Sequence, residues 1–160
     1  MSVEAAEKTD PAQVEQLKVI EKRWSKPLTK AGWTALPNTI LDKQVVLGLT
    51  PLDVNILMQI AKYWWSAENA PFPSIDTIAA AIDVTPRTVQ RRIARMEKAK
   101  LIERNKRYYA QGGQKSNAYT FKGLIARCTP FAEEAVKERE RKKATARANA
   151  RRRQPLTVVK

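Results

Sequence analysis

The side chains best suited to recognising another molecule follow the pair Thr85-Pro86, where Arg87, Thr88, Gln90 and Arg91 stand close together in the chain. An arginine guanidinium can donate two hydrogen bonds to one guanine, and a glutamine amide can pair with adenine in the same bidentate way. Arg87, Gln90 and Arg91 are therefore candidates for reading base edges, and Thr88 lies among them. For each arginine, the alternative is a phosphate contact or a plain surface charge.

A second set of side chains suits the sugar-phosphate backbone, because their charge or hydroxyl can meet a phosphate without reading the sequence. Helix starts add backbone N–H groups that favour anions. We expect these residues to hold phosphates or to lie within reach of them: Ser74, Thr85, Arg92, Arg95, Arg104, Lys106, Arg107 and Lys115.

Two helices joined by a turn must position these groups. Ser74 can cap a first helix, whose apolar side chains recur at i, i+3, i+4 and i+7, namely Ile75, Ile78, Ala79 and Ile82. Asp83-Val84 turns the chain. Thr85-Pro86 then starts a second helix with a hydroxyl at the N-cap and proline at N1, and its apolar side chains share one face, namely Val89, Ile93 and Met96.

Two strand-like runs follow, Leu101–Tyr109 and Asn117–Lys122, and a glycine-containing turn joins them. Tyr119 and Phe121 alternate with polar residues, which predicts a hairpin with its aromatic side chains toward the core. From Thr85 through Gly123 the chain carries eleven basic and two acidic residues.

The stretch PSIDTIAAAIDVTPRTVQRRIARMEKAKLIERNKRYYAQGGQKSNAYTF resembles the winged helix-turn-helix domains of bacterial, phage and plasmid regulators. This resemblance implies a mainly α fold with a small β-hairpin, and a recognition helix that begins after Thr85. The upstream LTPLDVNILMQIAKYWW is similar to the first helix of such domains, and Thr50 to Asp53 within it form a capping-box-like start. Asp83 and Lys100 stand where glycine is common in the family.

The remaining segments divide the chain into 1–32, an N-terminal extension, 33–127, the winged domain, and 128–160, a basic tail. Pro11 to Trp24 predicts a short amphipathic helix that either docks on the domain or forms a dimer contact. Ser25 to Thr34 is expected to be a connector, and WTALPNTIL could add a short strand beside the wing. From Thr129-Pro130 onward we expect a solvated helix that ends in a disordered basic segment.

Composition restricts the function further. The 160 residues carry a net charge of +14, which points to a polyanion as partner. No run is long and apolar enough for a membrane helix, so we expect a cytoplasmic protein without a membrane partner. Cys128 is the only cysteine and histidine is absent, which excludes a disulfide or a Cys/His zinc site within one chain. We therefore expect no metal, no cofactor and no catalytic activity.

Together these features predict a sequence-specific double-stranded DNA-binding protein that regulates transcription by occupying a promoter, as a monomer or a homodimer. One alternative is a plasmid or phage protein of replication initiation or partition, because the entry to the wing is also similar to that of winged-helix initiators. The other is a basic RNA-binding protein, which the charge would suit.

Overall fold

The computed structural model describes residues 11–152 and divides the chain into two compact units, Met1–Ala35 and Leu36–Lys160. The first unit contains α1 (Pro11–Trp24), as the sequence predicts, and α2 (Lys26–Ala31). The expectation of a plain connector at Ser25 to Thr34 is therefore wrong. Ser25 turns the chain with a φ of 75°, and the Thr29 hydroxyl donates to the Ser25 carbonyl over 3.0 Å, which closes the short second helix.

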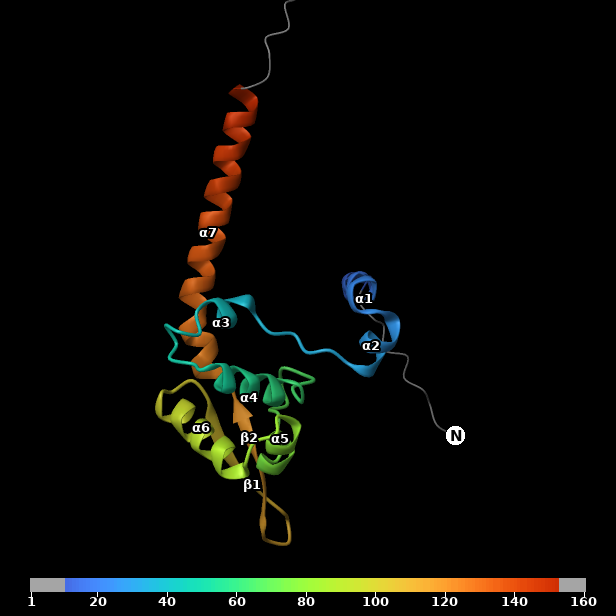
Figure 1. Ribbon diagram of the computed structural model, residues 1–160, viewed down its shortest axis with the longest axis vertical. Helices are drawn as coiled ribbons and strands as arrows, with labels where there is room; N and C mark the ends of the chain where they lie inside the picture. The colour runs from blue at the N-terminus through green and yellow to red at the C-terminus, as the bar shows by residue number, and fades with distance from the viewer. Residues whose placement is uncertain (1–10, 153–160) are drawn as a thin grey trace, which may run out of the picture. The chain divides into compact units, whose positions relative to one another are not determined.

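The second unit is mainly helical and has one antiparallel hairpin, which confirms the predicted winged helix-turn-helix architecture. Figure 1 shows several of its helices gathered around the hairpin and a long last helix extending away from them. The elements are α3 (Asn38–Asp42), α4 (Pro51–Ala61), α5 (Ile75–Ala81), α6 (Pro86–Lys98), β1 (Glu103–Tyr108), β2 (Gln114–Thr120) and α7 (Lys122–Arg152).

The core of this unit lies where α4, α5 and α6 meet the hairpin. Val89 and Ile93 of α6 are fully buried, as their helical phase predicts, and they pack in one cluster with Ile78 of α5. Tyr119 and Phe121 are buried, which confirms the predicted inward face of the hairpin. The cluster also includes Ile56, Leu57, Ile60, Ala79, Met96, Leu101 and Ile102.

Side-chain caps fix the starts of the three helices that surround this core. The Ser74 hydroxyl accepts from Thr77 N over 3.0 Å at the start of α5. At the start of α4, Thr50 Oγ1 accepts from Asp53 N, and Asp53 Oδ2 accepts from Thr50 N over 2.8 Å. This reciprocal pair is the predicted capping box, and it places the Asp53 carboxylate in the interior.

Asp83 and Lys100, which stand where glycine is common in winged helix-turn-helix domains, both adopt the left-handed backbone conformation. Asp83 has a φ of 52° and Lys100 a φ of 55°. This conformation costs a residue with a Cβ about 1–2 kcal/mol, less for aspartate. The bend at Lys100 leads directly to Leu101 and Ile102 in the core, so burial of these two apolar side chains offsets its cost.

The segment before α4 does not contribute a strand, contrary to the expectation for WTALPNTIL. Residues of this segment instead form α3, and Ile40 packs into the core. Pro37 is the N-cap of that helix and has no N–H to offer a strand ladder. The connector before α5 lies beside the wing in its place, since Tyr119 N donates to the Pro71 carbonyl over 2.8 Å.

The wing is a tighter hairpin than the sequence suggests. Its second strand begins at Gln114 rather than Asn117, because Gly112 and Gly113 both take a φ near 90° and reverse the chain in few residues. The register runs from Glu103 opposite Thr120 to Tyr108 opposite Gln114.

The last helix also differs from expectation, because α7 starts at Lys122 and continues through Pro130 without a break. Leu124 and Cys128 are buried, so the first turns of α7 belong to the core. Burial also raises the pKa of the Cys128 thiol, which keeps it protonated. From 139 to 150 every side chain is exposed. The disordered end expected for the tail falls on 153–160, outside the described residues.

Candidate nucleic-acid interface

The outer face of α6 is strongly basic. Val89 and Ile93 face the core, and at 100° per residue the opposite side of α6 carries Arg87, Arg91 and Lys98. All three are exposed, and Ala94 lies between them on the same face. Gln90 is exposed at one edge of this face. The short side chain of Ala94 among these cations lets the helix backbone come close to a flat or grooved partner.

Sequence reasoning missed two members of this face, Ala94 and Lys98. The helical projection that places Arg91 outside also places Lys98 there, seven residues further along, so the signal was present in the sequence. Lys98 lies near the end of the helix, away from the N-terminal residues on which the sequence argument concentrated.

Thr85 and Thr88 are partly committed to the start of α6. Thr85 Oγ1 accepts from Thr88 N over 3.2 Å, and the two hydroxyl oxygens lie 2.9 Å apart. Ser74 and Thr77 repeat this pair at the start of α5, with hydroxyl oxygens 2.7 Å apart. A hydroxyl has a donor and two acceptor sites, so Ser74 and Thr85 keep capacity for a further contact.

Arg92 and Arg95 point toward the start of α4. Arg92 Nη1 lies 3.9 Å from Asp53 Oδ1, and Arg95 Nη1 lies 3.7 Å from Asp53 Oδ2. Arg95 also donates to the Gly48 carbonyl over 3.0 Å. The Arg92 side chain is only 26% exposed, whereas that of Arg95 is 52% exposed. Arg95 can therefore reach outward, and Arg92 mainly compensates the buried carboxylate.

Arg104 joins the wing to α6. Its Nε donates to Glu97 Oε2 over 2.8 Å, and its backbone N–H donates to the other carboxylate oxygen. The hydrogen bond from the Arg104 side chain holds the pKa of Glu97 below its ordinary value of 4.5. The charge of Arg104 is thus neutralised within the molecule, which weakens its candidacy as a phosphate ligand.

The wing cations rest against aromatic rings. The Arg107 guanidinium carbon lies 3.8 Å from the centroid of the Phe72 ring, and Lys115 Nζ lies 4.5 Å from that of Tyr109. Lys106 is exposed at the irregular position of the strand pair. All three cations keep access to solvent, so the wing adds a second basic element to the face of α6.

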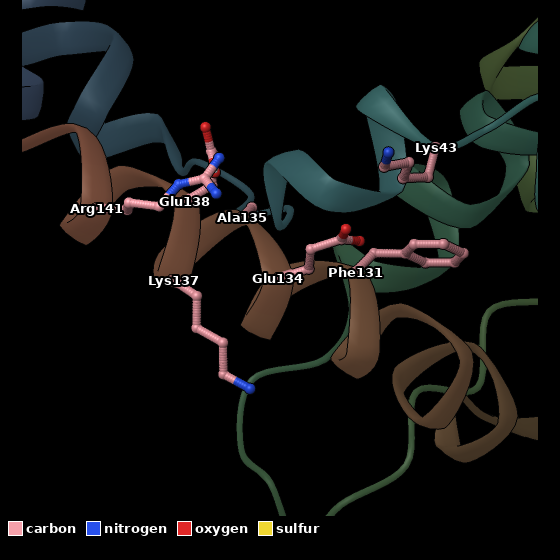
Figure 2. Close-up of a pocket in the computed structure, with 7 residues that line it drawn as sticks. All are labelled: Lys43, Phe131, Glu134, Ala135, Lys137, Glu138 and Arg141. Atoms are coloured by element: carbon pink, nitrogen blue, oxygen red, sulfur yellow. The ribbon is translucent and has the colours of Figure 1, made fainter.

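Away from α6 and the wing, a hollow of about 410 Å³ lies between the end of α3 and α7. Figure 2 shows Lys137 on its rim, pointing away from Phe131 and Lys43. Lys43 Nζ lies 5.4 Å from the centroid of Phe131, and Glu138 pairs with Arg141 over 2.6 Å. Three cations and two carboxylates line this hollow, so most of its charge is compensated and it attracts a polyanion less than the outer face of α6 does. Within residues 11–152 the structure contains no cluster of His, Cys, Asp or Glu suited to a metal ion and no helix able to cross a membrane.

Comparisons with known proteins agree with the fold of the second unit. A sequence profile of a helix-turn-helix domain family matches residues 47–102. The N-terminal domain of the DnaD protein from Geobacillus kaustophilus HTA426 superimposes with a TM-score of 0.51 at 16% identity, over 75% of this chain and 96% of that one. The sequence matches no curated protein.

Two further solved structures superimpose less well. One is a possible transcriptional regulator from Methanosarcina mazei Go1, with a TM-score of 0.42 at 16% identity over 68% of this chain and 85% of that one. The other is MepR of S. aureus in complex with DNA, with 0.41 at 18% identity over 86% and 98%. At these identities a likeness concerns the fold alone, and the two lower TM-scores add nothing to it.

Proposed function

We infer that this winged helix-turn-helix protein binds duplex DNA in a sequence-specific way, with α6 in the major groove. The observation that carries the proposal is the single outward face of α6, on which exposed Arg87, Arg91 and Lys98 surround Ala94. An α-helix fits the major groove, and a small residue at the centre of the contact lets the helix backbone come close.

The side chains divide into two roles. Arg87, Gln90 and Arg91 are near the N-terminus of α6, the part of a recognition helix that approaches base edges, and they can pair with guanine or adenine. Phosphate contacts then come from the flanks, namely Ser74, Thr85, Arg95, Lys98, Lys106, Arg107 and Lys115. Thr88 stays near the helix start, and we assign Arg92 and Arg104 to holding the structure together.

We propose that the protein regulates transcription by occupying a promoter. Occupancy needs only a folded reading unit with enough affinity, and the basic surfaces of α6, the wing and α7 would supply that affinity. The chain would then act on a site defined by its bases rather than on any polyanion. A role in replication initiation or partition would use the same face, and the position of the selected site relative to promoters and origins distinguishes the two.

Selection from a random duplex library with the full chain tests the proposal. We expect an enriched sequence of a few defined base pairs, whose half-site symmetry and spacing would also report a homodimer. Structured RNA of equal charge is the control competitor. Enrichment of no sequence, or equal competition by RNA, would contradict sequence-specific duplex binding and would favour the RNA-binding alternative.

A further inference from the structure

An aromatic hollow of about 380 Å³ opens between the end of α4, the start of α5 and the wing. Three rings line it, those of Tyr63, Trp65 and Phe72. Trp65 is 83% exposed and Phe72 is 53% exposed, so two large apolar surfaces meet water side by side. The rest of the lining is uncharged. It consists of Pro73 and of three residues that carry hydroxyls, Ser74, Thr77 and Ser116.

The two adjacent tryptophans have separate surroundings. The Trp64 ring lies against Phe121, with centroids 5.3 Å apart, and so covers the core. Trp65 lines the hollow instead. The exposure of Trp65 is therefore not a by-product of packing at Trp64, because the core contact is complete without it.

Cations of the wing accompany the rings. The Arg107 guanidinium carbon lies 3.8 Å from the centroid of Phe72, one of the rings that line the hollow, and its N–H groups can donate to a phosphate. Farther along the hairpin, Tyr109 is 57% exposed and carries Lys115 at 4.5 Å. Exposed rings thus alternate with cations from the hollow to the tip of the wing.

We propose that the aromatic hollow binds an unpaired nucleotide of a single-stranded nucleic acid, with its base stacked on Trp65 and Phe72 and its phosphate on Arg107. Every base has a π-face, and exposed rings interleaved with cations are the surface that single strands use. The hydroxyls of Ser74, Thr77 and Ser116 can meet the polar edge of the base. An apolar peptide would fill the hollow too, but it would gain nothing from Arg107 and Lys115. This site goes beyond the duplex-binding function and does not depend on it.

Anisotropy titrations of the full chain with labelled oligothymidylate and oligouridylate test the proposal, and the two oligonucleotides distinguish DNA from RNA as the source of the strand. We expect Trp65→Ala to weaken single-strand binding about tenfold, the value of one stacked base, and Trp65→Phe to restore part of the loss. Trp24→Ala removes another exposed tryptophan of the chain and is the matched control, with no expected effect.

Duplex affinity measured on the same variants keeps the two proposals apart. Trp65→Ala should leave duplex affinity unchanged. Arg91→Ala should weaken duplex binding and leave single-strand binding unchanged. A protein that selects no duplex but binds the oligonucleotide through Trp65 would contradict the proposed function and support this site. Equal affinity of Trp65→Ala and the parent for both oligonucleotides, or no binding at low salt, would overturn the site.

A measurement without mutation guards against a folding defect. An oligonucleotide containing 5-iododeoxyuridine, irradiated in the complex, should crosslink to Trp65 or Phe72, since these rings would contact the base. Crosslinks confined to α6 or α7 would overturn the assignment.

Discussion

The buried Asp53 carboxylate lies 3.9 Å from the guanidinium of Arg92, which connects the start of α4 to the middle of α6. Asp53 is fully buried, and its other oxygen accepts from both the backbone and the hydroxyl of Thr50. The carboxylate therefore caps one helix and compensates a cation on the next. The consequence is that two neighbouring arginines of α6 have different roles, Arg92 toward the interior and Arg91 toward the outside.

We expect Arg92→Ala to lower the free energy of unfolding by about 1–3 kcal/mol, because it leaves a buried carboxylate with one cation fewer. Arg91→Ala removes an exposed side chain and should stay within about 0.5 kcal/mol of the parent. Urea unfolding followed by circular dichroism compares them. Equal stability of the two variants would show that Asp53 does not need Arg92.

Base reading and phosphate contact should separate between α6 and the wing. Arg91→Ala should cost about 1–3 kcal/mol on the selected duplex and relax its base preference, because a bidentate pair is lost. Lys115→Ala should weaken all duplexes alike and lower the salt slope by about one. Titrations over a range of salt concentrations on selected and scrambled duplexes measure both. Uniform loss in both variants would refute the assignment of base reading to α6.

The sequence predicts those features of the site that are local. Helical phase places Val89 inside and Arg91 outside, and the hydroxyls of Ser74 and Thr85 cap their helices as expected, because each depends on residues within one turn.

The parts that escape prediction depend on contacts between distant residues. Nothing in the sequence links Arg92 to Thr50 and Asp53, about forty residues earlier, so the sequence predicts an arginine available for a phosphate. Likewise, Arg104 meets Glu97 only because the chain bends sharply at Lys100. Helix α7 passes Pro130 because its first turns are anchored in the core through Leu124 and Cys128, which outweighs the loss of one backbone hydrogen bond.

Gly123 should be intolerant of any side chain. A Cβ at this position would lie 1.9 Å from the carbonyl oxygen of Lys100, and Leu124 N donates to the Leu101 carbonyl next to it. Gly123→Ala must push α7 away from this bend, so we expect a loss of about 1–3 kcal/mol or more in unfolding experiments. Gly112→Ala is the control, since its Cβ would meet no atom within 4 Å and it pays only for its left-handed backbone. A Gly123 variant as stable as the parent would show that α7 is not held against this bend.

The ion pair between Glu97 and Arg104 should make the free energy of unfolding depend on pH in the acidic range. The Arg104 hydrogen bond lowers the pKa of Glu97 in the folded protein below its ordinary value of 4.5. The ion pair therefore contributes fully to folding stability above pH 4.5, and this contribution is lost as the pH falls through the pKa of the folded state. Thermal melts of Glu97→Gln and the parent should therefore differ at neutral pH and converge toward low pH. A difference that stays constant across this range would contradict the pairing.

The exposed part of α7 should supply affinity without specificity. From Lys137 to Lys160 the chain carries ten basic and two acidic residues, and within residues 139 to 150 no side chain is buried. Deleting this segment should weaken binding to every duplex and flatten its salt dependence while the ranking of sequences stays the same, because phosphate attraction does not read bases. The core should survive, since Cys128 is the last buried residue in the part of the chain that the structure describes.

A full-length variant in which Lys137, Lys143 and Arg147 become glutamine separates charge from length. It should reproduce part of the change in salt dependence with α7 intact, which band-shift titrations at several salt concentrations can measure. Loss of the preferred sequence in either variant, or a fall from dimer to monomer on sedimentation, would identify this segment as a recognition arm or an assembly helix instead.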